Sequence, residues 1–242
     1  MKTFEDKIYN EDCLVTLSKM DDDSVDLIVT SPPYNMNVSS SNNSKKLWNK
    51  GIVYANYDDN MSQKDYEEWQ TTVLRECLRV IKPSGSIFYN HKDILRDGVI
   101  IPPIWVYKFS VHQQIIWNRE SSHMLDKHYF FPITEYIYWI VKDAKKVKFD
   151  RTKAYQKKCI WDLKFERNTK HPAPFPISLV ENIVCACSEE GNIVYDLFMG
   201  SGTTAVVAKR YDRHYIGSEI SEEYVKIAEE RIALEARQLR LF

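Results

Sequence analysis

The 242-residue sequence contains no apolar run long enough to cross a membrane. A membrane helix needs about 18 to 20 consecutive apolar residues, and here the hydrophobic residues are spread along the whole chain. The first residues also lack the basic and apolar regions of a secretory signal peptide. This size and composition predict one domain with a sizeable core, located in the cytoplasm.

Cysteine is too scarce and too irregularly spaced for a disulfide framework. The five cysteines form an odd number, which favours a reducing compartment. Cys185 and Cys187 are close together but have no second pair and no group of histidines nearby. We therefore expect small core residues there and no metal site.

Net charge is also nearly absent, at −1, but this value hides a local excess of basic residues. Between Lys142 and Lys170 there are eleven Lys or Arg and four Asp or Glu. Such a block is often only a solvated face. Here aromatic residues such as Phe149, Tyr155 and Trp161 interrupt it, which favours a surface that meets nucleic acid.

The most informative motif is Thr30-Ser31-Pro32-Pro33-Tyr34-Asn35, which follows the apolar run 25–29. That run predicts a buried parallel strand, and the two prolines fix φ at about −65° and prevent a helix. The Ser31 hydroxyl, the Pro32 carbonyl and the Tyr34 ring should therefore meet in a cleft. Two acceptors beside an aromatic ring suit a planar base with an exocyclic amine. The alternative is a simple proline turn with a half-buried tyrosine.

A second motif lies near the other end of the sequence, at residues 193–204. A strand-like run ending at Asp196 leads through Gly200 and Gly202 into a helical segment at 205–210. Strand, glycine turn and helix N-terminus form a common cofactor platform. The spacing Gly200-x-Gly202-x-x-Ala205 also matches a dinucleotide fingerprint, so a nicotinamide enzyme has to be considered. The short remaining chain and the carboxylate of Asp196, which would repel a pyrophosphate, argue against it.

Together these motifs resemble those of the amino-methyltransferases that modify DNA bases. Residues 30–35 resemble the family's catalytic motif, residues 196–204 its S-adenosylmethionine motif, and residues 170–176 the segment before the glycine turn. The catalytic motif comes first, which is the permuted order of the family's β group. The resemblance implies an α/β fold, doubly wound around a mostly parallel sheet. It covers nearly the whole chain, as a single methyltransferase domain at 1–242.

The resemblance also implies a site for S-adenosylmethionine. Asp12 would meet the adenine amine, the Cys13 backbone N–H a ring nitrogen, and Glu219 the ribose hydroxyls. Asp12 could equally cap a helix at 14–20, and Glu219 could be a solvated carboxylate at a strand end. The other residues implied for this site line or close over the methionine half of the cofactor: Thr30, His171, Pro172, Ala173, Asp196, Phe198, Gly200, Ser201, Gly202, Thr203 and Thr204.

Catalysis at Ser31, Pro32, Pro33 and Tyr34 would then rest mainly on orientation. An exocyclic amine is a poor nucleophile because its lone pair is delocalised into the ring. If Ser31 and the Pro32 carbonyl accept its two protons, the lone pair is free to attack the methyl group in line. Within the family, Ser before Pro-Pro-Tyr favours N4 of cytosine, and N6 of adenine stays the alternative. Carbon-5 methylation is not expected, because no cysteine follows a proline.

Double-stranded DNA is the expected partner, and its target base would have to flip out to reach the cleft and stack on Tyr34. We predict a target-recognition region at about 121–168. A loop at about 35–60 is either a disordered surface loop or a mobile cover that orders on DNA. The basic residues proposed to contact DNA are Lys45, Lys46, Arg119, His123, Lys127, Arg151, Lys153, Lys157 and Lys158.

The pattern of apolar residues predicts alternating helices and strands. Helices are expected at 62–81, 99–109, 176–187 and 221–239, and strands at 86–89, 113–117 and 130–141. Both active motifs should emerge at the carboxyl ends of adjacent strands, where such sheets bind ligands.

Other functions remain open from the sequence alone. The same proline motif could serve methylation of RNA or of a protein amide, although those enzymes usually have Asn in place of Ser31 and the opposite motif order. A non-catalytic DNA-binding protein could also keep this fold. The sequence does not decide whether the chain forms a homodimer or works beside a cognate restriction endonuclease.

Overall fold

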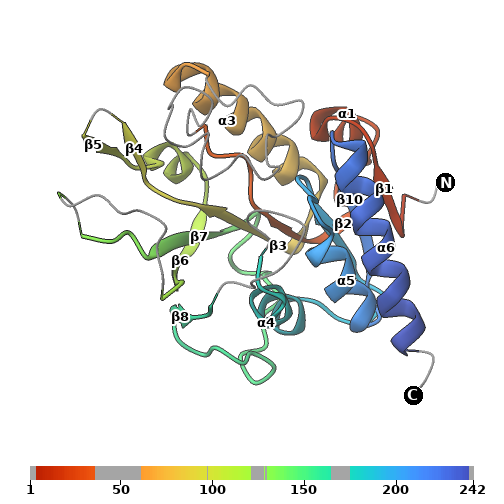
Figure 1. Cartoon of the computed structure of the whole chain (residues 1–242). Helices are drawn as coiled ribbons and strands as arrows, with labels where there is room; N and C mark the ends of the chain where they lie inside the picture. Colours follow the sequence, from red (N-terminus) through yellow and green to blue (C-terminus); the bar gives the residue numbers. More distant parts are fainter. Residues whose placement is uncertain are drawn as a thin grey trace.

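An eight-stranded sheet runs through the computed structural model, which describes residues 4–35, 61–96, 98–120, 128, 130–164 and 175–239 (Figure 1). From edge to edge the strands are β1 (Lys7–Tyr9), β10 (His214–Ser218), β9 (Ile193–Asp196), β2 (Val25–Thr30), β3 (Ile81–His91), β7 (Thr134–Val141), β6 (Val111–Asn118) and β8 (Ile160–Asp162). Within this sheet only β7 runs against the other strands. The prediction of an α/β fold with a mostly parallel sheet is confirmed.

Helices cover both faces of the sheet, as a doubly wound fold requires. On one face lie α1 (Cys13–Leu17), α3 (Gln63–Val80) and the 3-10 helix η1 (Ile104–Lys108). On the other face lie α4 (Ile177–Cys187), α5 (Thr203–Arg210) and α6 (Glu222–Leu239). Each set of helices buries its own hydrophobic cluster against the sheet.

Strand β2 shows why the central strands read as continuous apolar runs. Leu27 and Val29 pack toward α4, α5 and α6, whereas Ile28 between them packs toward α1 and α3. All three side chains are fully buried. A parallel strand covered on both faces has no solvent side, so its sequence does not alternate between apolar and polar residues.

Helix α3 matches its prediction closely. Ser62 caps it, with Oγ accepting a 3.1 Å hydrogen bond from the Asp65 backbone N–H. Its buried stripe includes Tyr66, Val73 and Cys77 at helical spacing. The helix ends at Val80, and β3 begins at the next residue.

Three sequence predictions of elements need correction. Instead of a helix at 99–109, β4 (Ile94–Arg96) and β5 (Val99–Ile101) form a small antiparallel sheet, and only η1 is helical. Three β-branched residues favour the strand, and the following proline pair lacks backbone donors. The strand expected at 130–141 begins only at Thr134, and Phe130 is fully exposed. The helix expected at 14–20 ends at Leu17.

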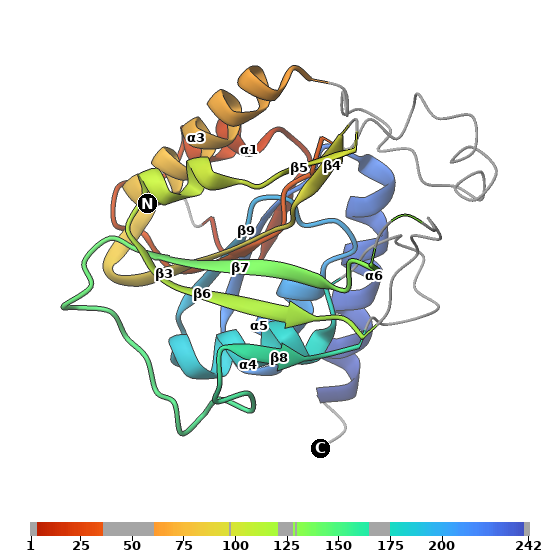
Figure 2. The ribbon, with the colours of Figure 1, turned by 90° about the vertical axis from the view of Figure 1, so that its left-hand side faces the viewer.

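The carboxyl edge of the sheet gathers the ends of β2, β3, β6, β9 and β10 together with the start of β7. In Figure 2 the arrowhead of β6 points to this edge. Within the described residues, no helix has the length and hydrophobicity that a membrane crossing needs.

Candidate active site

The ends of β2 and β9 bring the two sequence motifs together. These strands are parallel neighbours, with Leu27 opposite Val194 and Ile28 opposite Tyr195. Thr30 Oγ1 donates a 2.9 Å hydrogen bond to Asp196 Oδ1 across the edge. The prediction that both motifs emerge from adjacent strands is confirmed.

Asp196 is a buried carboxylate with three protein donors. Besides Thr30, the Phe198 backbone N–H donates to Oδ1 at 3.1 Å, and Thr204 Oγ1 donates to Oδ2 at 2.7 Å. Asp196 is only 4% exposed, and this burial raises its pKa to about 6 even though the three donors favour the charged form. The carboxylate thus ties the end of β2 to the glycine turn and to α5.

The glycine turn requires glycine for two reasons. Gly200 and Gly202 have φ of 51° and 83°, in the left-handed region that other residues rarely adopt. A Cβ on Gly202 would also lie 2.7 Å from the Ala228 Cβ of α6. Arg231 of α6 donates to the Ser201 carbonyl at 2.6 Å and to its hydroxyl at 2.8 Å. Helix α6 therefore fixes the turn from outside.

Two further carboxylates stand at neighbouring strand ends. Glu219 follows β10, and its two oxygens accept 2.8 Å hydrogen bonds from the Gly200 and Ser221 backbone N–H groups. Glu219 is half-buried and this burial raises its pKa, so it is only partly solvated, in contrast to the alternative interpretation. Asp12 follows β1 and caps α1 by accepting from Leu14 N at 2.8 Å, which confirms the alternative role considered for it. Burial strongly raises the pKa of the neighbouring Cys13 thiol.

Helix α3 holds the backbone of the proline motif. Tyr66 Oη donates to the Pro33 carbonyl at 2.9 Å and lies 2.9 Å from His91 Nε2. Since Tyr66 has a single proton, Nε2 of His91 must be the donor in the second bond. Burial lowers the pKa of His91 to about 4, which keeps the ring neutral at pH 7. Within the described part of the chain, no hydrogen bond occupies the Pro32 carbonyl.

Asn35 closes the motif and joins it to the start of α3. Its side-chain amide donates to the Met61 carbonyl at 2.9 Å and accepts from the Met61 N–H at 2.8 Å. Its φ of 56° is left-handed, a conformation that Asn tolerates better than most residues. The loop predicted at 35–60 lies, apart from Asn35, outside the described residues.

A polar cluster beside Ser31 was not predicted from the sequence. Ser31 Oγ lies 2.7 Å from Tyr34 Oη, and Asn90 Nδ2 lies 2.5 Å from the same tyrosine oxygen. Asn90 also donates to Glu135 at 2.7 Å, and Arg119 pairs with Glu135 at 2.9 Å. The sequence had one usable signal, because Glu135 is the only charged residue of the apolar strand β7.

The Tyr34 ring is flanked on the active edge. Lys92 Nζ lies 4.9 Å from the ring centroid, and the His91 ring lies 5.2 Å away at a tilt of 58°. The hydroxyl end points to Ser31 and Glu135 through the contacts given above. The Lys92 ammonium and the His91 ring therefore lie beside the Tyr34 ring, while its hydroxyl contacts Ser31 and Glu135.

The basic segment, which is the described part of the block between Lys142 and Lys170, begins at the end of the sheet opposite the active edge. It leaves β7 at Val141, which pairs with Ser86, and the Lys148 N–H donates to the Ser84 carbonyl at 3.0 Å. This is the amino end of β3, away from the edge that holds Ser31, and Figure 2 shows the segment leaving β7 there and returning to β8. Its basic side chains nominated for DNA are exposed: Arg151, Lys153, Lys157 and Lys158.

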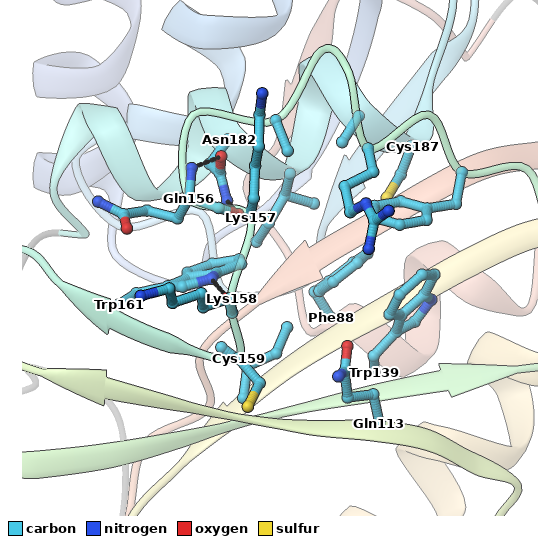
Figure 3. Close-up of a pocket in the computed structure, with 16 residues that line it drawn as sticks. Phe88, Gln113, Trp139, Gln156, Lys157, Lys158, Cys159, Trp161, Asn182 and Cys187 are labelled. Atoms are coloured by element: carbon cyan, nitrogen blue, oxygen red, sulfur yellow. Dashed lines mark hydrogen bonds between the residues drawn. The ribbon is translucent and has the colours of Figure 1, made fainter.

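A cavity of about 170 Å³ separates part of this segment from α4 and the sheet (Figure 3). Lys157, Lys158 and Arg151 line it together with aromatic residues of the sheet. Phe149 packs against Trp139 at 5.1 Å, and Trp161 is buried. Trp161 is therefore a core residue and unavailable for stacking, whereas Phe149 keeps 47% and Tyr155 65% of its surface exposed.

Arg119, also nominated for DNA contact, is largely used inside the protein. It pairs with Glu135, donates to the Pro132 carbonyl at 2.7 Å, and keeps only 12% of its side chain exposed. In the described part of the chain, no group of three or more metal-ligating side chains is found. Several nominated residues lie outside the described residues: Lys45, Lys46, His123, Lys127, His171, Pro172 and Ala173.

Comparisons with known proteins agree on one family. The sequence model of the family described as DNA methylase, of the N6/N4 type, matches residues 25–230. The Type II methyltransferase M.BglII of Bacillus subtilis is 32% identical, over 92% of this chain and 67% of its own length. The Type II methyltransferase M2.DpnII of Streptococcus pneumoniae is 31% identical, over 94% of this chain and 90% of its own length.

Solved structures agree with this assignment. The PvuII DNA methyltransferase, described as cytosine-N4-specific, superposes with a TM-score of 0.75 over 93% of this chain and 85% of its own, at 22% identity, which shows the shared fold. A candidate DNA modification methylase from Thermus thermophilus, in complex with S-adenosyl-L-methionine, gives a TM-score of 0.70 at 25% identity. That alignment covers 95% of this chain and 93% of the other.

Proposed function

Since this chain belongs to the N6/N4 DNA methylase family and is thus an S-adenosylmethionine-dependent DNA amino-methyltransferase, we propose that its target is N4 of cytosine. The observation that carries the proposal is Ser31 before Pro-Pro-Tyr at the carboxyl end of β2, one strand away from the glycine turn. The likeness in fold to a cytosine-N4-specific enzyme supports the same choice. Methylation of N6 of adenine is the alternative, because the family includes both reactions.

The residues at the edge of the sheet suit S-adenosylmethionine, whose sulfonium and ammonium groups are cationic and whose ribose carries two hydroxyls. Each Glu219 oxygen has one backbone donor, which leaves acceptor capacity for the ribose hydroxyls. The left-handed glycines let the backbone of the turn approach the methionine half closely. Asp12 and the Cys13 N–H are proposed for the adenine ring, and His171, Pro172 and Ala173 for closing the site.

Two residues proposed for the cofactor site already make hydrogen bonds within the protein. Asp196 already accepts three hydrogen bonds, so it shapes the site mainly by holding Thr30, Thr204 and the Phe198 backbone in place. Asp12 uses one oxygen to cap α1 and keeps the other for an amine. The remaining residues proposed for this site form the turn itself: Phe198, Gly200, Ser201, Gly202 and Thr203.

The cofactor supplies an electrophilic methyl group, and the chain orients the amine that attacks it. In the proposed mechanism Ser31 Oγ and the Pro32 carbonyl each accept a hydrogen bond from one N–H of the amine, which frees the nitrogen lone pair, and the surplus proton leaves the methylated nitrogen to solvent. The Tyr66–Pro33 hydrogen bond and the fixed φ of Pro32 and Pro33 keep these acceptors in place. The Tyr34 ring would stack on the flipped base, which requires the Lys92 ammonium to share or leave the ring face.

We propose DNA contacts both next to the active edge and on the basic segment farther from it. Lys45, Lys46, His123 and Lys127 belong to segments that start at the active edge, next to Asn35 and Glu120. Arg151, Lys153, Lys157 and Lys158 are exposed and would reach phosphates farther along the duplex, and Arg119 would do so only with the 12% of its side chain that is exposed. A recognition region at 121–168 and a cytoplasmic location, both expected from the sequence, remain proposals, as do a homodimer and a partner endonuclease.

The test is expression in a methylation-free bacterial host, followed by mapping of modified bases with single-molecule sequencing. N4-methylcytosine in one short motif is the expected result, and a Ser31→Ala variant should leave the genome unmodified. N6-methyladenine in the motif would keep the mechanism but contradict the choice of base. An unmodified genome, with cofactor binding intact, would contradict both.

A further inference from the structure

Glu135 is a buried carboxylate beside the proposed catalytic serine that the mechanism above does not use. It lies near the start of β7, on the active edge, and only 5% of it is exposed. Burying a charge is unfavourable unless it is paired and hydrogen-bonded. The position of Glu135 among Arg119, Asn90 and Tyr34 supplies both conditions and joins three neighbouring strands with the proline motif.

The ion pair with Arg119 determines the charge of this cluster. Arg119 Nη1 donates to Glu135 Oε1 at 2.9 Å, and register places Glu135 opposite Trp117 on β6, two residues before the arginine. The second guanidinium nitrogen, Nη2, donates to the Pro132 carbonyl. Because Arg119 stays protonated, it favours the ionised carboxylate, which can only accept hydrogen bonds.

An ionised Glu135 fixes the orientation of the Asn90 amide. Asn90 Nδ2 lies 2.7 Å from Glu135 Oε2, 2.5 Å from Tyr34 Oη and 3.5 Å from Ser31 Oγ, so its two protons go to the two nearer oxygens. Turning the amide over would set its oxygen against the carboxylate. Its carbonyl oxygen is buried without a hydrogen-bond partner in the described part of the chain. The carboxylate therefore sets the orientation of the Asn90 amide, even though the amide oxygen then lacks a hydrogen bond within the described residues.

The ionised Glu135 also fixes the proton of Tyr34. Its hydroxyl lies 2.7 Å from Ser31 Oγ and 3.2 Å from Glu135 Oε2. The shorter contact is satisfied by a proton from either oxygen. The contact with Glu135 is favourable only when Tyr34 donates, since two acceptor oxygens would otherwise face each other. Ser31 must then donate its own proton to Tyr34, which leaves its lone pairs for the substrate amine.

We propose that Glu135 is a positioning residue for methyl transfer: through Asn90 and Tyr34 it holds the Ser31 hydroxyl as an acceptor toward the target amine. The inference rests on the proposed function, but it applies equally to cytosine N4 and adenine N6. No proton has to travel along the chain of hydrogen bonds. Only the direction of the hydrogen bonds matters, because a Ser31 hydroxyl that accepted a hydrogen bond from Tyr34 would have one lone pair fewer for the amine.

The test compares Glu135→Gln with Tyr34→Phe and with the double variant, in steady-state and single-turnover methyl transfer to duplex DNA. Glu135→Gln should lower kcat about 10- to 100-fold with little change in the KM for DNA or for the cofactor. Tyr34→Phe removes the hydroxyl through which Glu135 acts. The double variant should then be no slower than Tyr34→Phe, whereas independent effects would multiply.

Two further variants separate positioning from loss of stability. Asp26→Asn removes another partly buried, ion-paired carboxylate, bonded to Lys82 at 2.7 Å at the opposite end of the sheet, and should leave kcat unchanged. Glu135→Asp keeps the charge but withdraws it from Tyr34, so it should also slow transfer even if Glu135→Gln fails to fold. A normal kcat in either Glu135 variant, or multiplying effects in the double variant, would overturn the inference while wild-type transfer upholds the function. Absence of transfer by the wild type would overturn both.

Discussion

At the scale of single residues, the candidate site depends on a few polar atoms whose hydrogen-bond directions are fixed by their neighbours. The Pro33 carbonyl can only accept, which makes Tyr66 its donor and His91 Nε2 the donor to Tyr66, and the Arg119–Glu135 pair makes Tyr34 a donor to the carboxylate. Both tyrosines therefore orient groups of the proline motif. A substitution that changes a single atom can therefore disturb the orientation of these groups.

Ser31→Ala should reduce kcat for methyl transfer by about 10²- to 10³-fold, as expected for the loss of one preorganised hydrogen-bond partner. The affinity for S-adenosylmethionine should not change, because no contact with the cofactor is proposed for the Ser31 side chain. Single-turnover kinetics and calorimetric titration measure the two quantities separately. An equal loss of cofactor affinity would contradict the role assigned to Ser31.

Asp196→Asn should change how stability depends on pH. The pKa of Asp196 is about 6 in the folded protein, above the ordinary value of 3.8, so only the folded chain is protonated between these values. The free energy of unfolding contributed by this group is therefore highest in acid and falls as pH rises through about 6. In Asp196→Asn this fall should disappear.

Denaturant unfolding at several pH values between 4 and 7 measures the effect. The difference in stability should move in favour of Asp196→Asn as pH rises, whatever constant offset its lost acceptor causes. Asp143→Asn, which changes a half-exposed carboxylate at a turn beside Lys146, serves as the control. Parallel stability curves for wild type and Asp196→Asn would contradict the burial argument.

At the scale of elements, the glycine turn and helix α6 form one unit. Gly202 packs against Ala228, Arg231 holds Ser201, and α5 begins at the next residue, Thr203. The N-terminus of α5 therefore keeps its place only while α6 is packed on it. The turn is a local sequence motif, but its position comes from a helix about thirty residues further along the chain.

Gly202→Ala should destabilise the protein by at least about 2 kcal/mol, because it adds both a positive-φ penalty and a clash with Ala228. It should also weaken S-adenosylmethionine binding by shifting the turn. Thermal unfolding and cofactor titration test the two effects. Gly191→Ala is a matched control, since its φ of 77° is equally left-handed but a Cβ there would meet open space. Equal destabilisation in both variants would exclude the packing contribution.

At the scale of the whole molecule, the basic segment and the active edge lie toward different ends of the sheet. Between Ser86 and His91 the strand β3 rises about 17 Å, close to the width of a duplex. Lys157 and Lys158 come just before β8, which runs back to the active edge. Arg151 and Lys153 follow Asp150, whose N–H bonds to Ala186 at the end of α4.

We therefore expect unequal contributions of these residues to DNA binding. Lys157→Gln with Lys158→Gln should reduce the slope of log affinity against log salt by about 2, as for the loss of two phosphate contacts. Arg151→Gln with Lys153→Gln, a change of the same charge, should reduce it less. Fluorescence anisotropy with a duplex at several salt concentrations measures both. Equal reductions would contradict the argument from position.

The sequence by itself determined the parts of this protein whose chemistry is local. Prolines limit φ, glycines permit left-handed turns, and apolar runs form strands, so the two motifs and the mostly parallel sheet could be predicted from neighbouring residues. Only the tertiary structure decided what stands beside Ser31. Asn90 and Glu135 lie on β3 and β7, Arg119 directly follows β6, and register across these three strands brings them together. Register depends on packing over the whole sheet, which no local pattern contains. For the same reason Arg119, read from the sequence as a DNA contact, is a partner of a buried carboxylate.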